Sequence, residues 1–122
     1  MTITISPNHG CKRGDVVLLL FPKSDLQTAR TRPALVIQAD DLNSGLPQVI
    51  VCMITSRMFR AGHRSRVVVS RGTEEGTHSG LLSDSVVMTD NLVTVSNNAI
   101  DQVIGALPMD RVDIALRYTL AL

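Results

Sequence analysis

The feature that most constrains the fold is a series of short, β-branched apolar runs, and the residues between them show no pattern that predicts a helix. These runs occupy residues 15–21, 34–39, 48–56, 66–70, 85–89, 92–95 and 99–107. Runs of this composition favour strands, and the prolines, glycines and polar residues between them favour turns. Parallel strands need long, usually helical crossovers, so five to seven such runs predict a compact, mainly antiparallel sheet or small barrel.

The pattern changes after residue 107. Pro108 suits the first turn of a helix, and Asp110 favours the positive end of its dipole. The residues that then recur at helical spacing are Val112, Ala115, Leu116, Thr119 and Leu120. We therefore expect an α+β fold that is mainly β, with one amphipathic helix at the C-terminus.

Two polar segments are predicted as loops. Residues 24–33 are polar and end at a proline, and residues 71–80 are punctuated by glycines. The second of these is expected to be exposed and mobile. In contrast, the middle of 48–56 is continuously apolar, which predicts a strand covered on both faces.

A chain of 122 residues is long enough to bury one core and too short for two, so residues 1–122 are expected to form a single domain. Two cysteines at no metal-binding spacing fit a reduced setting. No signal peptide and no apolar run of about 20 residues is apparent. These features predict a soluble cytoplasmic protein that does not enter a membrane.

The net charge of +1 hides an uneven distribution. Residues 1–71 hold ten basic and four acidic side chains, whereas residues 72–122 hold two basic and seven acidic ones. Five arginines fall within residues 57–71, which contain no carboxylate. Charge alone leaves two interpretations open, an anion-binding surface or a solvated arginine-rich loop.

Several classes of function lack their sequence patterns. His9, His63 and His78 are scattered, and neither CxxC nor HExxH occurs, so no metal site or metal cofactor is expected. Phosphate-binding glycine motifs and the GxSxG elbow of serine hydrolases are also absent. The three aromatic residues are too few for a typical base-stacking RNA module, so arginines and hydrogen bonds would have to hold any nucleic acid.

The remaining candidates are arginines near strand entrances and hydroxyl groups at a strand exit. This combination can hold a phosphodiester and stabilise its developing negative charge without a cofactor. Five segments in order, RGDVVLLLFP, TRPALVIQ, VIVCMITS, GLLSDSVVMTDN and VIGALPMDRVDIAL, resemble the successive signature blocks of the MazF/PemK toxin family. The resemblance spans nearly the whole chain.

This resemblance implies a small SH3-like antiparallel β-barrel of the MazF/PemK/CcdB type that forms a homodimer and is neutralised by a cognate antitoxin. It also implies a metal-independent, sequence-specific endoribonuclease of single-stranded RNA, in particular mRNA. In such cleavage the 2′-hydroxyl attacks the adjacent phosphorus and leaves 2′,3′-cyclic phosphate and 5′-hydroxyl ends. No cofactor is implied.

The resemblance also assigns site residues. The arginine of the family's RP motif falls on Arg32, which would stabilise the phosphorane, and the hydroxyl that ends the ITS strand falls on Thr55. Asp90 matches an acidic family position, as a base or as a residue that fixes Arg32 or a barrel turn. The RNA-binding candidates are Arg30, Ser56, Arg57, Arg60, Arg64 and Arg66.

The chain departs from the family pattern next to Asp90. Met88 stands where PemK-like members can carry an arginine, and Asn91, Leu92, Val93 and Thr94 represent the QxRT stretch. Arg57, Arg60 or Arg64 is the candidate substitute for that second arginine. Two other hypotheses remain open at this point: a noncatalytic, CcdB-like toxin that inhibits a protein target such as gyrase, and a degenerate RNA binder.

Overall fold

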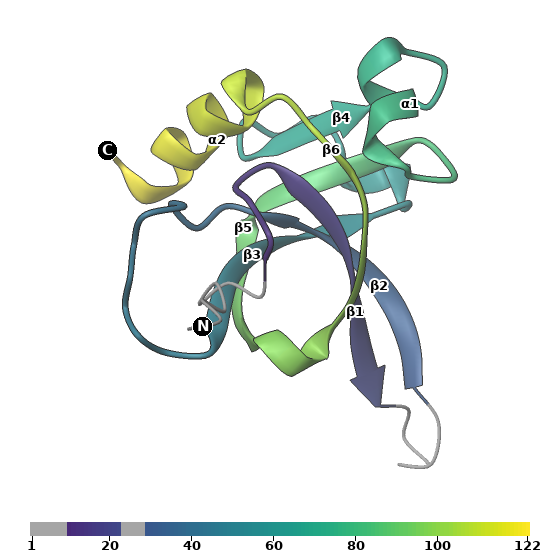
Figure 1. Ribbon diagram of the computed structural model, residues 1–122. Coiled ribbons are helices and arrows are strands. Elements are labelled where there is room, and N and C mark those ends of the chain that lie inside the picture. The colour runs from purple at the N-terminus through teal and green to yellow at the C-terminus, as the bar shows by residue number, and fades with distance from the viewer. Residues whose placement is uncertain (1–9, 23–28) are drawn as a thin grey trace.

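A computed structural model describes residues 10–22 and 29–122, in which the chain forms six strands, two α-helices and two short 3-10 helices (Figure 1). In chain order they are β1 (Asp15–Pro22), β2 (Ala29–Val36), β3 (Gln48–Thr55), η1 (Met58–Arg60), β4 (Arg66–Val69), α1 (Glu74–Ser79), β5 (Ser85–Ser96), η2 (Asn97–Ala99), β6 (Ile100–Ala106) and α2 (Asp110–Leu120).

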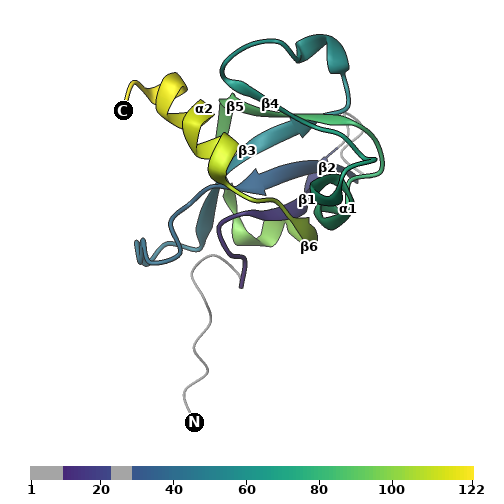
Figure 2. The ribbon, with the colours of Figure 1, turned by 90° about the horizontal axis from the view of Figure 1, so that it is seen from above.

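The six strands form one sheet in the order β4-β5-β3-β2-β1-β6, and every neighbouring pair is antiparallel. This confirms the predicted antiparallel architecture with a C-terminal helix. The sheet curls strongly, as Figures 1 and 2 show, but its edge strands β4 and β6 do not pair with each other. The fold is therefore an open, barrel-like sheet, with α1 and α2 at one end of it, where Arg111 of α2 forms an ion pair with Glu75 of α1 (Figure 1).

The central strands are buried on both faces, as the continuously apolar run in 48–56 predicted. Along β3, Cys52 and Ile54 belong to one core cluster, whereas Val51 and Met53 belong to a second cluster on the other face. Side chains alternate between the faces of a strand, so a strand between two cores has no polar positions in its middle. The curl of the sheet encloses the second cluster.

Helix α2 covers the first of these clusters. Its residues Val112, Ala115 and Leu116 are buried, as predicted, whereas Leu120 is half exposed. An ion pair also joins α2 to the residues before β1, because Arg13 Nη2 lies 2.6 Å from Asp113 Oδ1. Arg13 also donates from Nε to the carbonyl of Ile37 at 3.0 Å. The arginine that precedes β1 therefore joins the helix to the sheet.

The prediction of a loop over residues 24–33 is wrong for its second half. Residues 29–33 belong to β2, where Arg30 pairs with Phe21 and Arg32 pairs with Leu19 of β1. The backbone ladder with β1 stabilises a strand here although the side chains are polar, because strand preference depends strongly on the partner. The first half of the predicted loop, residues 24–28, lies outside the described residues.

Residues 71–80, predicted as an irregular loop, contain helix α1. The Thr73 side chain caps the helix by accepting a hydrogen bond from the Gly76 amide at 3.1 Å, and Gly80 ends it in the left-handed conformation. Glu74 and Glu75 occupy the first turn, where carboxylates interact favourably with the helix dipole. A threonine cap followed by two glutamates was the sequence signal for this helix.

The two predicted strands over 85–89 and 92–95 form a single strand, β5, that contains a bulge. The register with β3 changes from Met53 opposite Met88 to Cys52 opposite Leu92. Residues 89–91 therefore have no partners on β3. Such a bulge changes the direction of side chains along a strand, which matters for the site described below.

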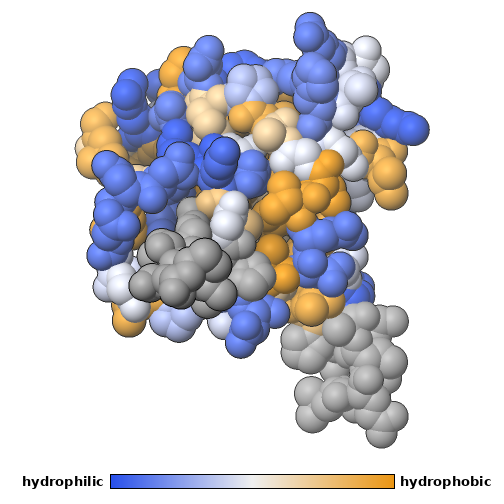
Figure 3. Space-filling model, in the orientation of Figure 1, coloured by the Kyte–Doolittle hydropathy of each residue, from blue (hydrophilic) through white to orange (hydrophobic). Residues whose placement is uncertain are grey.

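The surface and the cysteines agree with a fold that buries its apolar groups in two cores. In Figure 3 the hydrophobic surface of this face gathers over β1 and β6, where Leu20 and Val103 are partly exposed, and most of the surrounding surface is hydrophilic.

Cys11 and Cys52 are both buried and free, and burial raises the pKa of the Cys52 thiol to about 12. Within the described part of the chain, no helix has the length and apolar character needed to span a membrane.

Helix α1 packs so closely on β6 that only glycine fits at the contact. A Cβ atom on Gly105 would lie 2.3 Å from the carbonyl oxygen of His78 and 2.4 Å from the carbonyl carbon of Ser79. We expect Gly105→Ala to lower the free energy of unfolding by about 1 to 3 kcal/mol, because backbone must move to accept the methyl group. Urea denaturation measures this change.

Gly72→Ala is the matched control, because a Cβ atom at Gly72 would meet nothing within 4 Å. Its free energy of unfolding should stay within about 0.5 kcal/mol of the wild type or rise slightly. Equal destabilisation by the two substitutions would contradict the close contact between α1 and β6.

Candidate functional site

A pocket of about 810 Å³ opens between β2, β3 and the segment that follows α1. Its lining includes basic, hydroxyl and apolar side chains. The lining residues are Leu18, Arg30, Thr31, Arg32, Pro33, Met53, Ile54, Thr55, Ser56, Arg57, Arg60, Gly80, Leu81, Leu82, Ser83, Ser85, Met88, Asn91 and Ile104. Six of the nine predicted site residues are therefore in one place.

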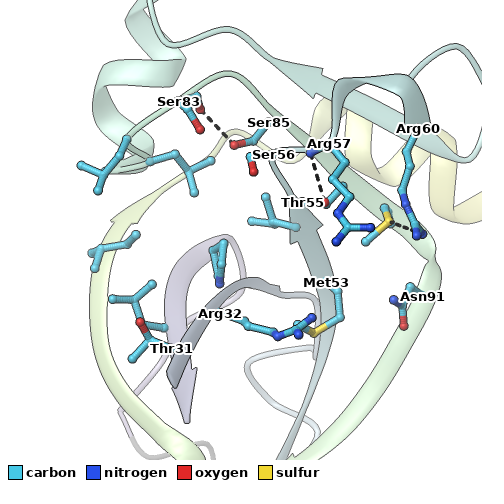
Figure 4. A pocket seen from close by; sticks show the side chains of 18 of the residues that line it. Thr31, Arg32, Met53, Thr55, Ser56, Arg57, Arg60, Ser83, Ser85 and Asn91 are labelled. Atoms are coloured by element: carbon cyan, nitrogen blue, oxygen red, sulfur yellow. Dashed lines mark hydrogen bonds between the residues drawn. The ribbon is translucent and has the colours of Figure 1, made fainter. Parts of the chain in front are cut away.

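The pocket opens where the ladder between β2 and β3 ends. The last pair of this ladder is Ala34 with Met53, and the next residue of β2 is Pro33, which has no backbone N–H to donate. Continuing the same register by two residues places Arg32 opposite Thr55. The two residues lie on neighbouring strands at this opening, and both side chains line the pocket (Figure 4).

Arg32 is exposed to solvent, and its guanidinium carbon lies 5.7 Å from the centroid of the Phe21 ring on β1. Among the described residues, no carboxylate forms an ion pair with Arg32. The contact with an aromatic ring orients the guanidinium without neutralising its charge. Arg32 is thus a cation that can bind an anion in the pocket.

Thr55 lies at the end of β3 and is tied to the residues after it. The backbone N–H of Arg57 donates a hydrogen bond to Thr55 Oγ1 at 3.2 Å, the dashed line beside Thr55 in Figure 4. The hydroxyl oxygen is used as an acceptor, so its hydrogen remains able to donate to a ligand. Ser56, the next residue, adds a second hydroxyl to the pocket lining.

Two further arginines reach the pocket from the connection between β3 and β4. In Figure 4, Arg57 and Arg60 extend toward the side of the pocket where Arg32 and Asn91 lie. Arg60 Nη1 lies 3.9 Å from the Met88 sulfur, and its buried Nε has no hydrogen-bond partner within the described part of the chain. With Arg30, the described lining carries four arginines and no carboxylate.

The other three predicted site residues lie outside this lining. Arg66 forms a two-point ion pair with Asp90, with distances of 3.2 and 2.7 Å, and Arg64 stacks on the ring of Tyr118 at 4.1 Å. The hydrogen bond from Arg66 lowers the pKa of Asp90 and raises that of Arg66. The expectation that Asp90 fixes Arg32 is wrong, because its partner is Arg66.

The bulge in β5 explains why Asp90 faces away from the pocket while its neighbour enters it. Thr89 is buried and bonds to the Ser65 carbonyl at 2.6 Å, Asp90 pairs with Arg66, and Asn91 lines the pocket. Asn91 was not among the predicted site residues, and neither were Leu82 and Ser83. The block GLLSDSVVMTDN contains all three residues, so the family-like block itself was the available signal.

The donor set defines what the pocket can do chemically. Among residues 10–22 and 29–122, no group of three or more histidine, cysteine, aspartate or glutamate side chains could hold a metal ion. The polar side chains that line the pocket are hydrogen-bond donors and cations. They suit a phosphate group and can stabilise extra negative charge on it.

Comparison with known proteins finds similarity to toxins and endoribonucleases along most of the chain. A family model described as the PemK-like, MazF-like toxin of type II toxin-antitoxin systems matches residues 12–120. The chain is 36% identical over 107 residues to the endoribonuclease MazF2 of Mycobacterium bovis, covering 84% of this chain and 90% of that protein. The endoribonuclease MazF6 of Mycobacterium tuberculosis matches with the same identity and coverage.

Solved structures share the fold. A mycobacterial endoribonuclease in complex with its cognate antitoxin superposes with a TM-score of 0.70 at 21% identity, over 93% of this chain and 97% of that chain. A MazE-MazF complex of Deinococcus radiodurans gives a TM-score of 0.67 at 20% identity, over 92% and 96% of the two chains.

The ion pair between Asp90 and Arg66 makes stability depend on pH. A carboxyl whose pKa is lowered by folding stabilises the protein above its unfolded pKa and loses this effect as the pH falls through the folded pKa. At neutral pH, Asp90→Asn should therefore be less stable than the wild type. This difference in the free energy of unfolding should narrow as the pH falls below the ordinary aspartate value of 3.8.

Denaturation of both proteins between neutral pH and about pH 2 checks this expectation. Asp113→Asn, which breaks the Arg13 ion pair, serves as a comparison variant for loss of an ion pair elsewhere in the fold. A stability difference between Asp90→Asn and the wild type that does not change with pH would contradict the assignment.

Proposed function

The chain belongs to the PemK-like, MazF-like toxin family of type II toxin-antitoxin systems, and from this premise we propose that it is a metal-independent, sequence-specific endoribonuclease. Its substrate is single-stranded RNA, in particular mRNA, and its products carry 2′,3′-cyclic phosphate and 5′-hydroxyl ends. The observation that carries the proposal is that Arg32 and Thr55 line one basic pocket, whose described lining residues include no carboxylate.

The reaction requires the pocket to stabilise charge. The 2′-oxygen of the RNA forms a bond to the adjacent phosphorus as its proton leaves, and the bond to the 5′-oxygen breaks as that oxygen takes up a proton. Extra negative charge develops on the nonbridging oxygens between these events. The guanidinium of Arg32 stabilises this charge, and the Thr55 hydroxyl donates to a nonbridging oxygen.

The described lining residues include no histidine or carboxylate that could act as a conventional base. A guanidinium is suited to bind an anion through several N–H donors, so in this proposal Arg32 acts by stabilising charge. Asp90 has a supporting role through Arg66, which also donates to the Arg60 carbonyl at 3.0 Å.

The remaining arginines of the pocket bind the substrate backbone. Arg60 extends to Met88, the position where PemK-like members can carry an arginine, and supplies a guanidinium there from another part of the chain. Arg30 and Arg57 add charge on either side, and Ser56 adds a donor. This arrangement supports Arg60 as the substitute for the second arginine.

The alternative of a noncatalytic toxin that inhibits a protein such as gyrase is not favoured. Relatives that match most of the chain are named endoribonucleases, and the two residues expected to act on the phosphate share one pocket. The described pocket lining has four arginines and a threonine hydroxyl without a carboxylate, a set that suits a phosphodiester and that inhibition of a protein does not require. The same arrangement argues against a degenerate RNA binder.

The partners follow from the same proposal. Residues 1–122 act as a single toxin domain in the cytoplasm, where mRNA is found, and a cognate antitoxin neutralises it. The solved relatives include a toxin bound to its cognate antitoxin. An acidic or apolar segment of the antitoxin would cover the arginines of the pocket, which carry the charge that RNA would otherwise meet.

Incubation of the purified protein with single-stranded RNA in EDTA tests the proposed activity. We expect cleavage to continue in EDTA and to yield 5′-hydroxyl and cyclic phosphate ends. Arg32→Ala should lower the cleavage rate by about 100- to 1,000-fold, because a charge-stabilising donor is lost from the transition state. End mapping on gels and the initial rate measure both effects.

Arg117→Ala is the matched control, because Arg117 is exposed on α2 and does not line the pocket. It removes the same charge and should keep wild-type activity. Absence of cleavage across varied RNA sequences, or equal rates for wild type and Arg32→Ala, would refute the catalytic proposal.

We also expect a homodimer. A sheet of this size offers a shallow face to a long substrate, and a groove between two copies would hold single-stranded RNA better. Sedimentation at micromolar concentration should give a mass of twice 13.2 kDa. A monomer under these conditions would contradict this expectation and would leave the cleavage assay as an independent test.

A further inference from the structure

Phe59 is an aromatic residue that packs in neither hydrophobic core of the described structure. Its side chain is 77% exposed, and it belongs to neither core cluster of the described residues. In contrast, Phe21 packs against the second cluster, and Tyr118 contacts His63 and Arg64. The exposed apolar surface of the Phe59 ring is not buried by the two core clusters, so it is available for contact with a ligand or partner.

The turn that carries Phe59 is fixed relative to the candidate active site. Helix η1 starts three residues after Thr55, and the Arg57 N–H donates to the Thr55 hydroxyl. Within the turn, the Arg60 N–H donates to the Arg57 carbonyl at 3.0 Å, and Arg66 donates to the Arg60 carbonyl at 3.0 Å. The backbone next to Phe59 is therefore hydrogen-bonded to Thr55 of the pocket on one side and to Arg66 of β4 on the other.

The charge beside the ring indicates what it contacts. The Arg60 guanidinium carbon lies 5.7 Å from the Phe59 ring centroid, and Arg60 lines the pocket together with Arg57. The described pocket lining has no carboxylate to neutralise them. Arg57 and Arg60 attract an anion to this part of the pocket, and the flat, apolar ring of Phe59 lies beside Arg60. A nucleotide combines both features, a phosphate and a base with a flat face.

We propose that Phe59 is a base-stacking residue, on which an unpaired base of the RNA substrate stacks while Arg57 and Arg60 bind the neighbouring phosphates. This inference rests on the proposed endoribonuclease function and adds a substrate contact to it. Stacking does not depend on the hydrogen-bonding groups of a base, so Phe59 contributes affinity and position more than base identity. The small number of aromatic residues excludes an extended stacking platform but leaves room for one stacked base.

The chain contains no tryptophan, which allows a direct test. Phe59→Trp introduces one indole, whose fluorescence a stacked base quenches. The probe is a single-stranded RNA that contains the cleavage sequence mapped with the wild type and carries a 2′-O-methyl group at the attacking position. We expect saturable quenching by this RNA, and loss of quenching when the nucleotide at one particular position is made abasic.

Phe59→Leu removes the ring and keeps an apolar side chain. We expect it to bind the same RNA about 5- to 100-fold more weakly than the wild type, the range that loss of one stacked base produces. Phe59→Tyr should bind like the wild type, since it keeps the ring. Tyr118→Leu, which removes an aromatic ring outside the pocket, should also leave affinity unchanged, and thermal unfolding of Phe59→Leu should match the wild type.

The outcomes separate this inference from the function on which it rests. Cleavage by the wild type together with equal RNA affinity of Phe59→Leu, or with an indole signal that RNA does not change, would overturn the stacking role and leave the endoribonuclease intact. A change in sedimentation of Phe59→Leu would assign the ring to contact between two copies of the chain, which also overturns it. Absence of RNA binding and cleavage by the wild type would overturn both.

Discussion

The end of the hydrogen-bonded ladder between β2 and β3 is the constraint on which the site depends. Antiparallel pairing holds Ala34 opposite Met53, and Pro33 then supplies no N–H to continue it. Two residues beyond this last pair on each strand are Arg32 and Thr55, and both line the pocket that opens there. A short strand contact thus positions two groups that are far apart in the sequence.

Electrostatics in the folded chain depend on which arginines have acidic partners. Arg13, Arg66 and Arg111 form ion pairs with Asp113, Asp90 and Glu75, respectively. These pairs connect α2 to the start of β1, β4 to the β5 bulge, and α2 to α1. The arginines of the pocket lining have no such carboxylate beside them, so the positive field is concentrated there. The same arginine-rich segment therefore provides the Arg66 side chain that pairs with Asp90 and the Arg57 and Arg60 side chains that line the pocket.

Much of the fold could be predicted from local pattern. The missed helix α1 had a local signal in its threonine cap, whereas the two errors about strands have a common cause. The continuously apolar run in 48–56 predicted a strand buried on both faces, and β3 packs one face against each of the two core clusters. The polar residues 29–33 form a strand because β1 pairs with them, and 85–96 is one strand because β3 continues past the bulge. Both errors arose where a partner strand, which the sequence does not display, decided the local conformation.

The sequence by itself determined the strand content, the C-terminal helix and the family, and it singled out Arg32 and Thr55 through their blocks. Tertiary structure decided which of the other polar residues share the pocket with them. It places Asn91 and Arg60 inside and pairs Asp90 with a residue 24 positions away. The physical reason is that charge neutralisation and side-chain direction depend on strand register and on a bulge, and both are properties of pairs of strands rather than of any one segment.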